Sequence, residues 1–250
     1  MKRLITALTF ALLSVQIWAK ETVTISTSQW SPYITSVSPQ YGSMSTIINE
    51  AFANVGIKVE YVFLPWARAY EGAKSGEVDA TSYWYKDEKH ERDFLYSDPL
   101  TTDEVVFFRL KKKAGKTWRQ LDDFNGFRIG LTRGFTYTKA MWDYAEKHKG
   151  DVYIVGSDKQ NFQMLMLGRE DIVPAQKIVG QHILETLISS KHPDIVEMLS
   201  PPLSVRTGHL LFPKASKHSE DLIRQFNKGL AELKRSGRLK TLQQDLVVEE

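Results

Sequence analysis

Apolar residues recur at helical and strand spacing along the first third of the chain. One helical face is formed by Met44, Ile47, Ile48, Ala51, Phe52 and Val55, and Gly56 stands where a helix commonly ends. The β-branched run VTISTS precedes this helix, and the alternating stretch KVEYVFL follows it. Pro65 then opens a helix that continues to Gly76, and VDATSYW indicates a third strand. The order β-α-β-α-β predicts a parallel sheet with right-handed crossovers.

The same pattern starts again at FRIGLTRG, which indicates a strand that ends in a glycine turn. Residues 137–149 have the pattern of a helix. Further strands are indicated by VYIVGS, DIVPA and HLLFP, and further helices by QNFQMLML, KIVGQHILETLI and the C-terminal segment. Two α/β lobes are therefore predicted, with ligand space where the carboxyl ends of their strands face a common cleft.

Residues 1–19 differ from the rest of the chain. Lys2 and Arg3 precede an apolar run over residues 4–17, and a small residue closes the segment. The apolar run is short for a membrane span. This segment is therefore predicted to be a secretory signal peptide, so that the mature protein begins near Lys20. The alternative is an uncleaved amphipathic anchor.

Composition narrows the class of protein. Without Lys2 and Arg3 the chain carries 31 basic and 30 acidic residues, so its nearly neutral surface attracts nucleic acid weakly. There are no cysteines, which excludes disulfides, thiolate catalysis, cysteine-based metal sites and a lipid on an N-terminal cysteine. We therefore expect a protein free in the periplasm of a Gram-negative cell, with no nucleic-acid partner.

Motifs for catalysis and metal binding are absent from the sequence. The chain lacks G-x-S-x-G, a phosphate-binding loop, G-x-G-x-x-G and H-E-x-x-H, and its six histidines never occur at tight metal-ligand spacing. Asp79 and Asp171 each begin a predicted strand and are expected to be structural caps. No catalytic residue, metal or cofactor is therefore predicted.

Six segments carry a resemblance to a known family. They are VTISTSQWSPY, SGEVDA, FLYSDPL, LDDFNGFRIGLTRGFTY, GREDIVPAQ and LAELKRSGRLKTL. Their order and spacing resemble those of the periplasmic solute-binding proteins of family 3, which include the amino-acid-binding components of ABC importers. The resemblance implies a two-lobed α/β fold, the type II periplasmic binding protein, with a hinge of two crossover segments. Lobe one would comprise residues 20–100 and 208–250, lobe two residues 105–202, and the hinge residues 101–104 and 203–207.

The resemblance also implies a ligand-binding site. By position, it would be formed by Trp30, Trp66, Tyr83 and Tyr85 of lobe one and by Thr132, Gly134, Thr136 and Gln176 of lobe two. Aromatic faces can sandwich a planar or aliphatic ligand or hold a cation, while core packing is the alternative for Trp66, Tyr83 and Tyr85. The TRGFTY turn offers hydroxyl and backbone N–H groups to a carboxylate. Where the family usually has Gly-Thr, this chain has Gly134-Phe135.

Two charged positions of the family's amino-acid binders are changed in this chain. The family arginine that binds the ligand's α-carboxylate corresponds to His90, and the aspartate that holds the ammonium corresponds to Gln176. We therefore expect a ligand with less separated charge than a zwitterionic amino acid, held by stacking and neutral hydrogen bonds. The charged end of the stretch 83–100 is expected to be a solvated turn. Whether Arg68 or Arg92 reaches the cleft is left open.

The predicted function is capture of a small polar or aromatic metabolite by hinge closure, by a monomer that serves an inner-membrane ABC permease or a sensor. Two alternatives stay open. One is a periplasmic dehydratase-like enzyme on the same fold, in which Glu88 or His90 acts as acid or base. The other is an interaction protein that has lost its ligand. Product formation would identify the enzyme, and a cleft that retains no metabolite would identify the interaction protein.

Overall fold

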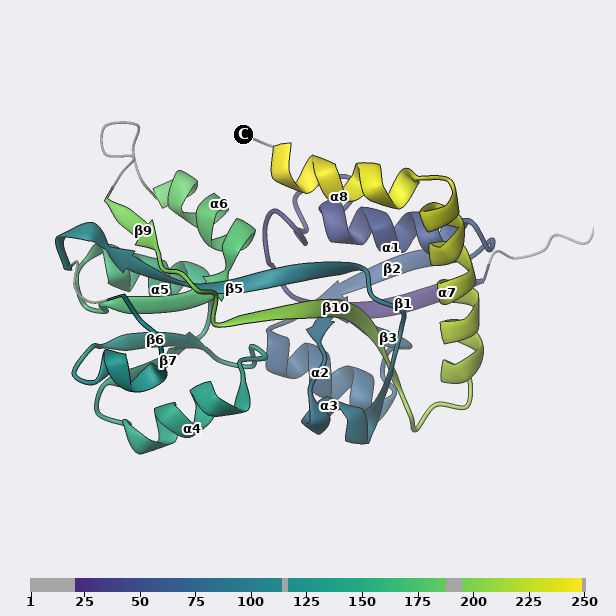
Figure 1. The fold of residues 1–250 in the computed structure, drawn as a ribbon. Coiled ribbons are helices and arrows are strands. Elements are labelled where there is room, and N and C mark those ends of the chain that lie inside the picture. The colour runs from purple at the N-terminus through teal and green to yellow at the C-terminus, as the bar shows by residue number, and fades with distance from the viewer. Residues whose placement is uncertain (1–20, 114–116, 188–194, 249–250) are drawn as a thin grey trace, which may run out of the picture.

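One mixed β-sheet runs through both lobes of the protein, and helices cover its faces (Figure 1). The computed structural model describes residues 21–113, 117–187 and 195–248. The strands lie in the order β2-β1-β3-β10-β5-β8-β6-β7, while β4 pairs with β10 and β9 pairs with β5. The two-lobed α/β architecture with two crossover strands agrees with the prediction.

The strands are β1 (Thr22–Thr27), β2 (Lys58–Phe63), β3 (Ala80–Tyr85), β4 (Phe94–Tyr96), β5 (Thr101–Leu110), β6 (Ile129–Thr132), β7 (Val152–Val155), β8 (Ile172–Gln176), β9 (Val196–Met198) and β10 (Ser204–Pro213). The helices are α1 (Ser43–Ala53), α2 (Trp66–Ser75), α3 (Glu88–Asp93), α4 (Lys139–Lys147), α5 (Asp158–Met166), α6 (Lys177–Leu187), α7 (Ser219–Arg235) and α8 (Arg238–Val248). Two 3₁₀ turns, η1 (Lys111–Lys113) and η2 (Leu121–Phe124), lie between β5 and β6. In the described ranges, no helix has the length and apolar character that crossing a membrane requires.

Lobe one is built around the parallel strands β2, β1 and β3, which pair as the β-α-β-α-β pattern predicted. The predicted apolar face of α1 is buried, and Phe52 on this face packs against Phe226 of α7 with ring centroids 4.9 Å apart. Helices α1, α7 and α8 lie on one face of this part of the sheet, and α2 and α3 lie on the other (Figure 1). Burial of these apolar faces is the main source of stability of the lobe.

Lobe two is built around β8, β6 and β7, which run parallel to one another. The carboxylate of Asp171, before β8, accepts hydrogen bonds from the backbone N–H and the guanidinium of Arg128, each at 3.0 Å. The carboxylate of Asp79, before β3, accepts one from the backbone N–H of Thr24 at 2.8 Å. Both residues are therefore structural, as expected.

The lobes are joined by β5 and β10, which pair antiparallel with each other from Thr101↔Gly208 to Val105↔Ser204. Beyond this region β5 pairs with β8 of lobe two, and β10 pairs with β3 of lobe one. The long strand β5 was not predicted as a strand, because a short apolar run such as VVFF fits a strand or a helix equally well. Residues 1–19, predicted to be a signal peptide, lie outside the described residues.

The charged stretch after β3 differs from the solvated turn that was predicted. Asp87 caps a short helix, α3, by accepting a hydrogen bond from the backbone N–H of Lys89 at 2.9 Å. Most charged side chains of α3 are exposed, but His90 is buried. Its ring packs between Tyr70 and Trp84, with centroids 5.1 and 5.2 Å away. The local charge pattern could not reveal this burial, because Tyr70 comes from another helix.

Candidate functional site

Aromatic side chains from both lobes meet in a small cavity of about 10 Å³. It is lined by Trp30, Trp66, Tyr83, Trp84, Tyr85, Gly134, Phe135 and Thr136. Six of these eight residues were predicted site residues, all but Trp84 and Phe135, and the eight come from four separate segments. This aromatic cavity has room for about one water molecule.

The position of each aromatic side chain follows from the helix or strand that carries or precedes it. Trp30 follows the carboxyl end of β1, and Trp66 is the first residue of α2, directly after Pro65. Tyr83 and Tyr85 lie two residues apart on β3 and therefore point to the same face of the sheet. A Cβ atom on Gly208 of β10 would lie 1.6 Å from the Tyr83 ring, so glycine is required there.

The turn after β6 brings lobe two against these rings. Gly134 has a φ of 79°, and a Cβ atom on it would lie 3.1 Å from the Cβ of Trp66. The ring of the next residue, Phe135, enters the aromatic cavity, with centroids 6.1 Å from Trp30 and 5.9 Å from Tyr85. Phe135 therefore fills space that the smaller family residue at this position would leave open.

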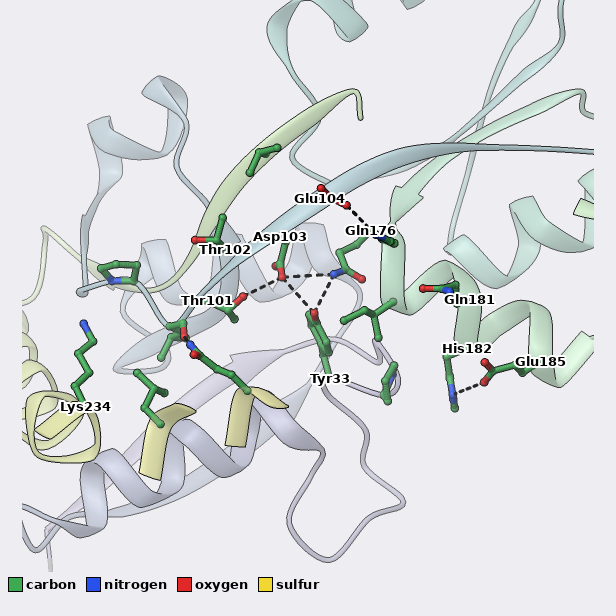
Figure 2. A pocket seen from close by; sticks show the side chains of 18 residues that line it. Tyr33, Thr101, Thr102, Asp103, Glu104, Gln176, Gln181, His182, Glu185 and Lys234 are labelled. Atoms are coloured by element: carbon green, nitrogen blue, oxygen red, sulfur yellow. Dashed lines mark hydrogen bonds and ion pairs between the residues drawn. The ribbon is translucent and has the colours of Figure 1, made fainter. Parts of the chain in front are cut away.

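Asp103, on β5, accepts hydrogen bonds at the centre of the cleft between the two lobes (Figure 2). The residue is 3% exposed. It accepts hydrogen bonds from Tyr83 Oη at 2.6 Å, Thr101 Oγ1 at 3.0 Å, Tyr33 Oη and Tyr85 Oη at 3.2 Å, and Gln176 Nε2 at 3.4 Å. Burial raises the pKa of Asp103, although these hydrogen bonds act in the opposite direction. Burial and the neighbouring Asp103 also raise the pKa of Tyr83 and Tyr85 well above 10.

Thr132 and Asp158 lie behind the aromatic cavity. Thr132 is buried and donates a short hydrogen bond to the Asp158 carboxylate, and the indole Nε1 of Trp30 donates a second at 3.2 Å. Burial raises the pKa of Asp158. Thr132 does not line the cavity; its contact with Asp158 helps to hold Trp30 from lobe two.

Gln176 lies beside Asp103 rather than in the aromatic cavity. Its Nε2 donates to Tyr33 Oη at 2.9 Å, and its Oε1 accepts from the backbone N–H of Val179 at 2.7 Å. His90 is farther away: it lines neither this cavity nor the larger groove described next. Arg68 and Arg92 are exposed and line neither space.

A groove of about 1020 Å³ opens on the other side of Asp103, between α6 and the C-terminal helices (Figure 2). Tyr33, Asp103 and Gln176 form part of its wall. Its rim carries an ion pair between Lys177 Nζ and Glu104 Oε2 at 3.1 Å. Volumes of this size accommodate small metabolites.

Arg206, on β10, is a functional candidate that sequence reasoning missed. Its guanidinium lies 5.6 Å from the centroid of the Tyr85 ring and donates to the backbone oxygen of Thr136 at 2.9 Å. A second donor reaches the backbone oxygen of Lys86. Burial lowers the pKa of Arg206, which nonetheless stays charged at neutral pH. Asp103 and Arg206 could have been suspected only from their place at the predicted crossings.

The described residues contain no group of three or more His, Cys, Asp or Glu side chains that could hold a metal ion. The site is instead built from rings, hydroxyls, one amide and buried carboxylates. Such an arrangement can bind a small organic ligand by stacking and hydrogen bonding.

Comparisons with known proteins identify the family to which the fold belongs. Residues 24–247 match the family described as bacterial extracellular solute-binding proteins, family 3. The L-cystine-binding protein TcyA of Bacillus subtilis (strain 168) is 25% identical over 193 residues, which cover 77% of this chain and 67% of that protein.

Two solved structures share the fold at low sequence identity. One is a histidine kinase sensor domain with similarity to periplasmic binding proteins, with a TM-score of 0.77 and 16% identity over 92% of this chain and 97% of that chain. The other is a mutant of ArgBP from T. maritima, with a TM-score of 0.76 and 20% identity over 91% of this chain and 96% of that chain. The resemblance found in the sequence and the predicted fold class are therefore confirmed. The chain belongs to the bacterial extracellular solute-binding proteins of family 3.

Proposed function

We propose that this solute-binding protein acts in the periplasm, where it captures a small polar or aromatic metabolite and presents it to an inner-membrane ABC permease. Residues 1–19 are a signal peptide that is removed on export. The protein acts as a monomer and releases its ligand chemically unchanged. Because a histidine kinase sensor domain shares the fold, delivery to a sensor is the second candidate.

The observation that carries the proposal is the meeting of aromatic side chains from both lobes. Trp30 and Trp66 of lobe one face Phe135 of lobe two across the aromatic cavity, and all three are buried. Rings at an interlobe boundary offer a ligand a large apolar contact that exists only when the lobes are closed. The large groove beside Asp103 adds space and polar groups.

Motion of the lobes is the second part of the proposal. The hinge comprises residues 101–104 and 203–207, with residues 20–100 and 208–250 on one side and residues 105–202 on the other. On opening, contacts such as that between Arg206 and Thr136 would break. A ligand that adds contacts to the closed form shifts the population toward it.

The experiment begins with native mass spectrometry of the protein purified from its own periplasm, which identifies any metabolite that stays bound. The protein is then unfolded, freed of ligand and refolded. Adding the metabolite back should raise the melting temperature and slightly reduce the radius of gyration in small-angle scattering, because the ligand binds the closed native state.

Two outcomes would contradict the proposal. A confirmed tight ligand that leaves the scattering curve unchanged would exclude hinge closure. Conversion of the metabolite to a product would indicate the enzyme. A matched control is a metabolite of the same mass and charge that does not co-purify, which should leave both measurements unchanged.

A further inference from the structure

The buried carboxylate of Asp103 has hydrogen-bond donors but no counter-charge. Its donors are three phenols, one hydroxyl and one amide, all of them neutral. In the described part of the chain, no ion pair includes Asp103. An ionised group buried without a partner of opposite charge is costly to keep.

The same protein treats a structural carboxylate differently. Asp171 is also buried, but Arg128 and Lys113 both pair with it, at 3.0 and 3.2 Å. These two cations and their hydrogen bonds lower the pKa of Asp171 to about 2 despite the opposing effect of its burial. Asp103 has no such cations, and it forms part of the wall of the large groove, from which a ligand can reach it (Figure 2).

The basic residue opposite Asp103 forms its hydrogen bonds with other groups. Arg206 pairs with Asp103 in the strand register, yet its guanidinium binds the backbone oxygens of Thr136 and Lys86. Its acidic neighbour is Asp87, at 4.0 Å. This arginine therefore does not place its positive charge beside Asp103.

The tyrosines around Asp103 offer oxygen atoms to a cation. The hydroxyls of Tyr33, Tyr83 and Tyr85 point at the Asp103 carboxylate, and a phenol oxygen can accept a hydrogen bond from an ammonium as well as donate one. A second buried carboxylate, Asp158, contacts Trp30 and adds to the negative potential of the cleft.

The same cleft is unfavourable for a carboxylate group of a ligand. Such a group would enter a cleft that already holds two buried carboxylates, and Arg206 already donates two hydrogen bonds to backbone oxygens. Like charges at close range strongly disfavour ionisation of both groups. The position beside Asp103 therefore favours a cation over an anion.

We propose that Asp103 binds the positively charged group of the ligand, and that this ligand is an organic cation such as a primary amine with no neighbouring carboxylate. This inference rests on the proposed function, because it names the ligand class of the same cleft. The ammonium takes the place of the weak donor Gln176 Nε2, which lies 3.4 Å from Asp103. The remainder of the ligand occupies the large groove or the space between the rings.

The test is calorimetry on the refolded, ligand-free mature protein with three matched pairs of probes. They are agmatine and arginine, cadaverine and lysine, and 2-phenylethylamine and phenylalanine; the two members of each pair differ by the α-carboxylate alone. A library of organic cations, zwitterions, anions and neutral compounds is screened beside them. Organic cations should supply the hits, and in any pair that binds the amine should bind at least about 10-fold more tightly than its amino acid.

Asp103→Asn tests the residue itself, because asparagine keeps the shape and an acceptor but removes the charge. The variant should weaken binding of the amine at least about 30-fold, since a buried charge pair is lost. It should keep or raise the melting temperature of the ligand-free protein, because no counter-charge is lost there. Asp143→Asn makes the same chemical change on α4, at an exposed ion pair with Lys139 outside both spaces, and as the matched control should change affinity by less than about 3-fold.

The outcomes separate the two proposals. Tighter binding of the amino acids than of the amines, hits confined to anions, zwitterions or neutral compounds, or unchanged amine binding by Asp103→Asn would overturn this inference and leave the proposed function in place. Absence of saturable binding in every class would overturn both. The preference within the pairs is measured on the unmodified protein, so it holds even if a variant fails to fold.

Discussion

Asp103 and Arg206 lie directly opposite each other on β5 and β10, but their charged groups contact different parts of the cleft. Asp103 accepts hydrogen bonds from tyrosine hydroxyls, and Arg206 donates to a backbone oxygen of lobe two. Both residues lie within the proposed hinge. The strands that join the lobes thus also carry two charged groups that contact tyrosines of the candidate site.

Arg206→Lys should weaken the closed form. Arg206 contacts Thr136 of lobe two and Lys86 and Tyr85 of lobe one through a planar group with several donors, which lysine cannot reproduce. Ligand affinity should fall by about 10-fold, which corresponds to about 1.4 kcal/mol for lost hydrogen bonds from a charged group. Small-angle scattering of the ligand-free variant should show a slightly larger particle. Arg68→Lys on the exposed side of α2 is the control, and equal effects from both variants would refute a specific role for Arg206.

Trp66→Ala should reduce binding more than loss of any exposed charge. Trp66 is 8% exposed and lines the aromatic cavity, and removal of an aromatic anchor costs on the order of 1–3 kcal/mol of binding free energy. Titration calorimetry with the metabolite found in the periplasm measures the change. Trp142→Ala, at a half-buried position on α4 outside both spaces, controls for loss of a tryptophan. Normal binding by folded Trp66→Ala would mean that this ring is core packing.

Glu170→Gln should stabilise the protein at neutral and alkaline pH. Glu170 is fully buried, neither carboxylate oxygen has a hydrogen-bond partner, and burial raises its pKa from 4.5 to about 8. The folded state therefore keeps this proton where the unfolded state has lost it. The contribution of Glu170 is fully present below pH 4.5 and declines as pH rises to about 8, by up to about 1.4 kcal/mol per pH unit.

Denaturant unfolding between pH 4 and 9 measures this difference directly. The free energies of unfolding of the two proteins should converge near pH 4 and separate as pH rises, with the variant more stable. Glu185→Gln, at an exposed position on α6, should give a curve parallel to that of the unmodified protein. Parallel curves for Glu170→Gln as well would show that Glu170 ionises normally.

Export should remove the first 19 residues. N-terminal sequencing of protein from an osmotic-shock fraction should begin within a residue or two of Lys20, because a basic start and a short apolar run precede it. Lys2→Glu with Arg3→Glu removes the basic start and should leave precursor in the cytoplasm. Intact Met1 on the unmodified protein would contradict the periplasmic location.

Local periodicity predicted the helices and strands of both lobes, and the resemblance to the family predicted the aromatic residues of the candidate site. The stripe from Met44 to Val55 predicted α1, and the strand after it pairs with β1 as the β-α-β order requires. Trp30, Trp66, Tyr83 and Tyr85 were expected by position in the family, and the structure brings all four into one cavity. The inferences from periodicity depend on neighbours in sequence, where spacing alone decides which side a residue faces.

Tertiary structure alone decided the electrostatics of the cleft. Asp103 became a buried acceptor because Tyr33, Tyr83 and Gln176, which are distant in sequence, converge on it. His90 occupied a family ligand position by alignment but packs among rings outside the cavity. Burial and counter-charge depend on which segments meet in space, and no periodic pattern in the sequence records that meeting.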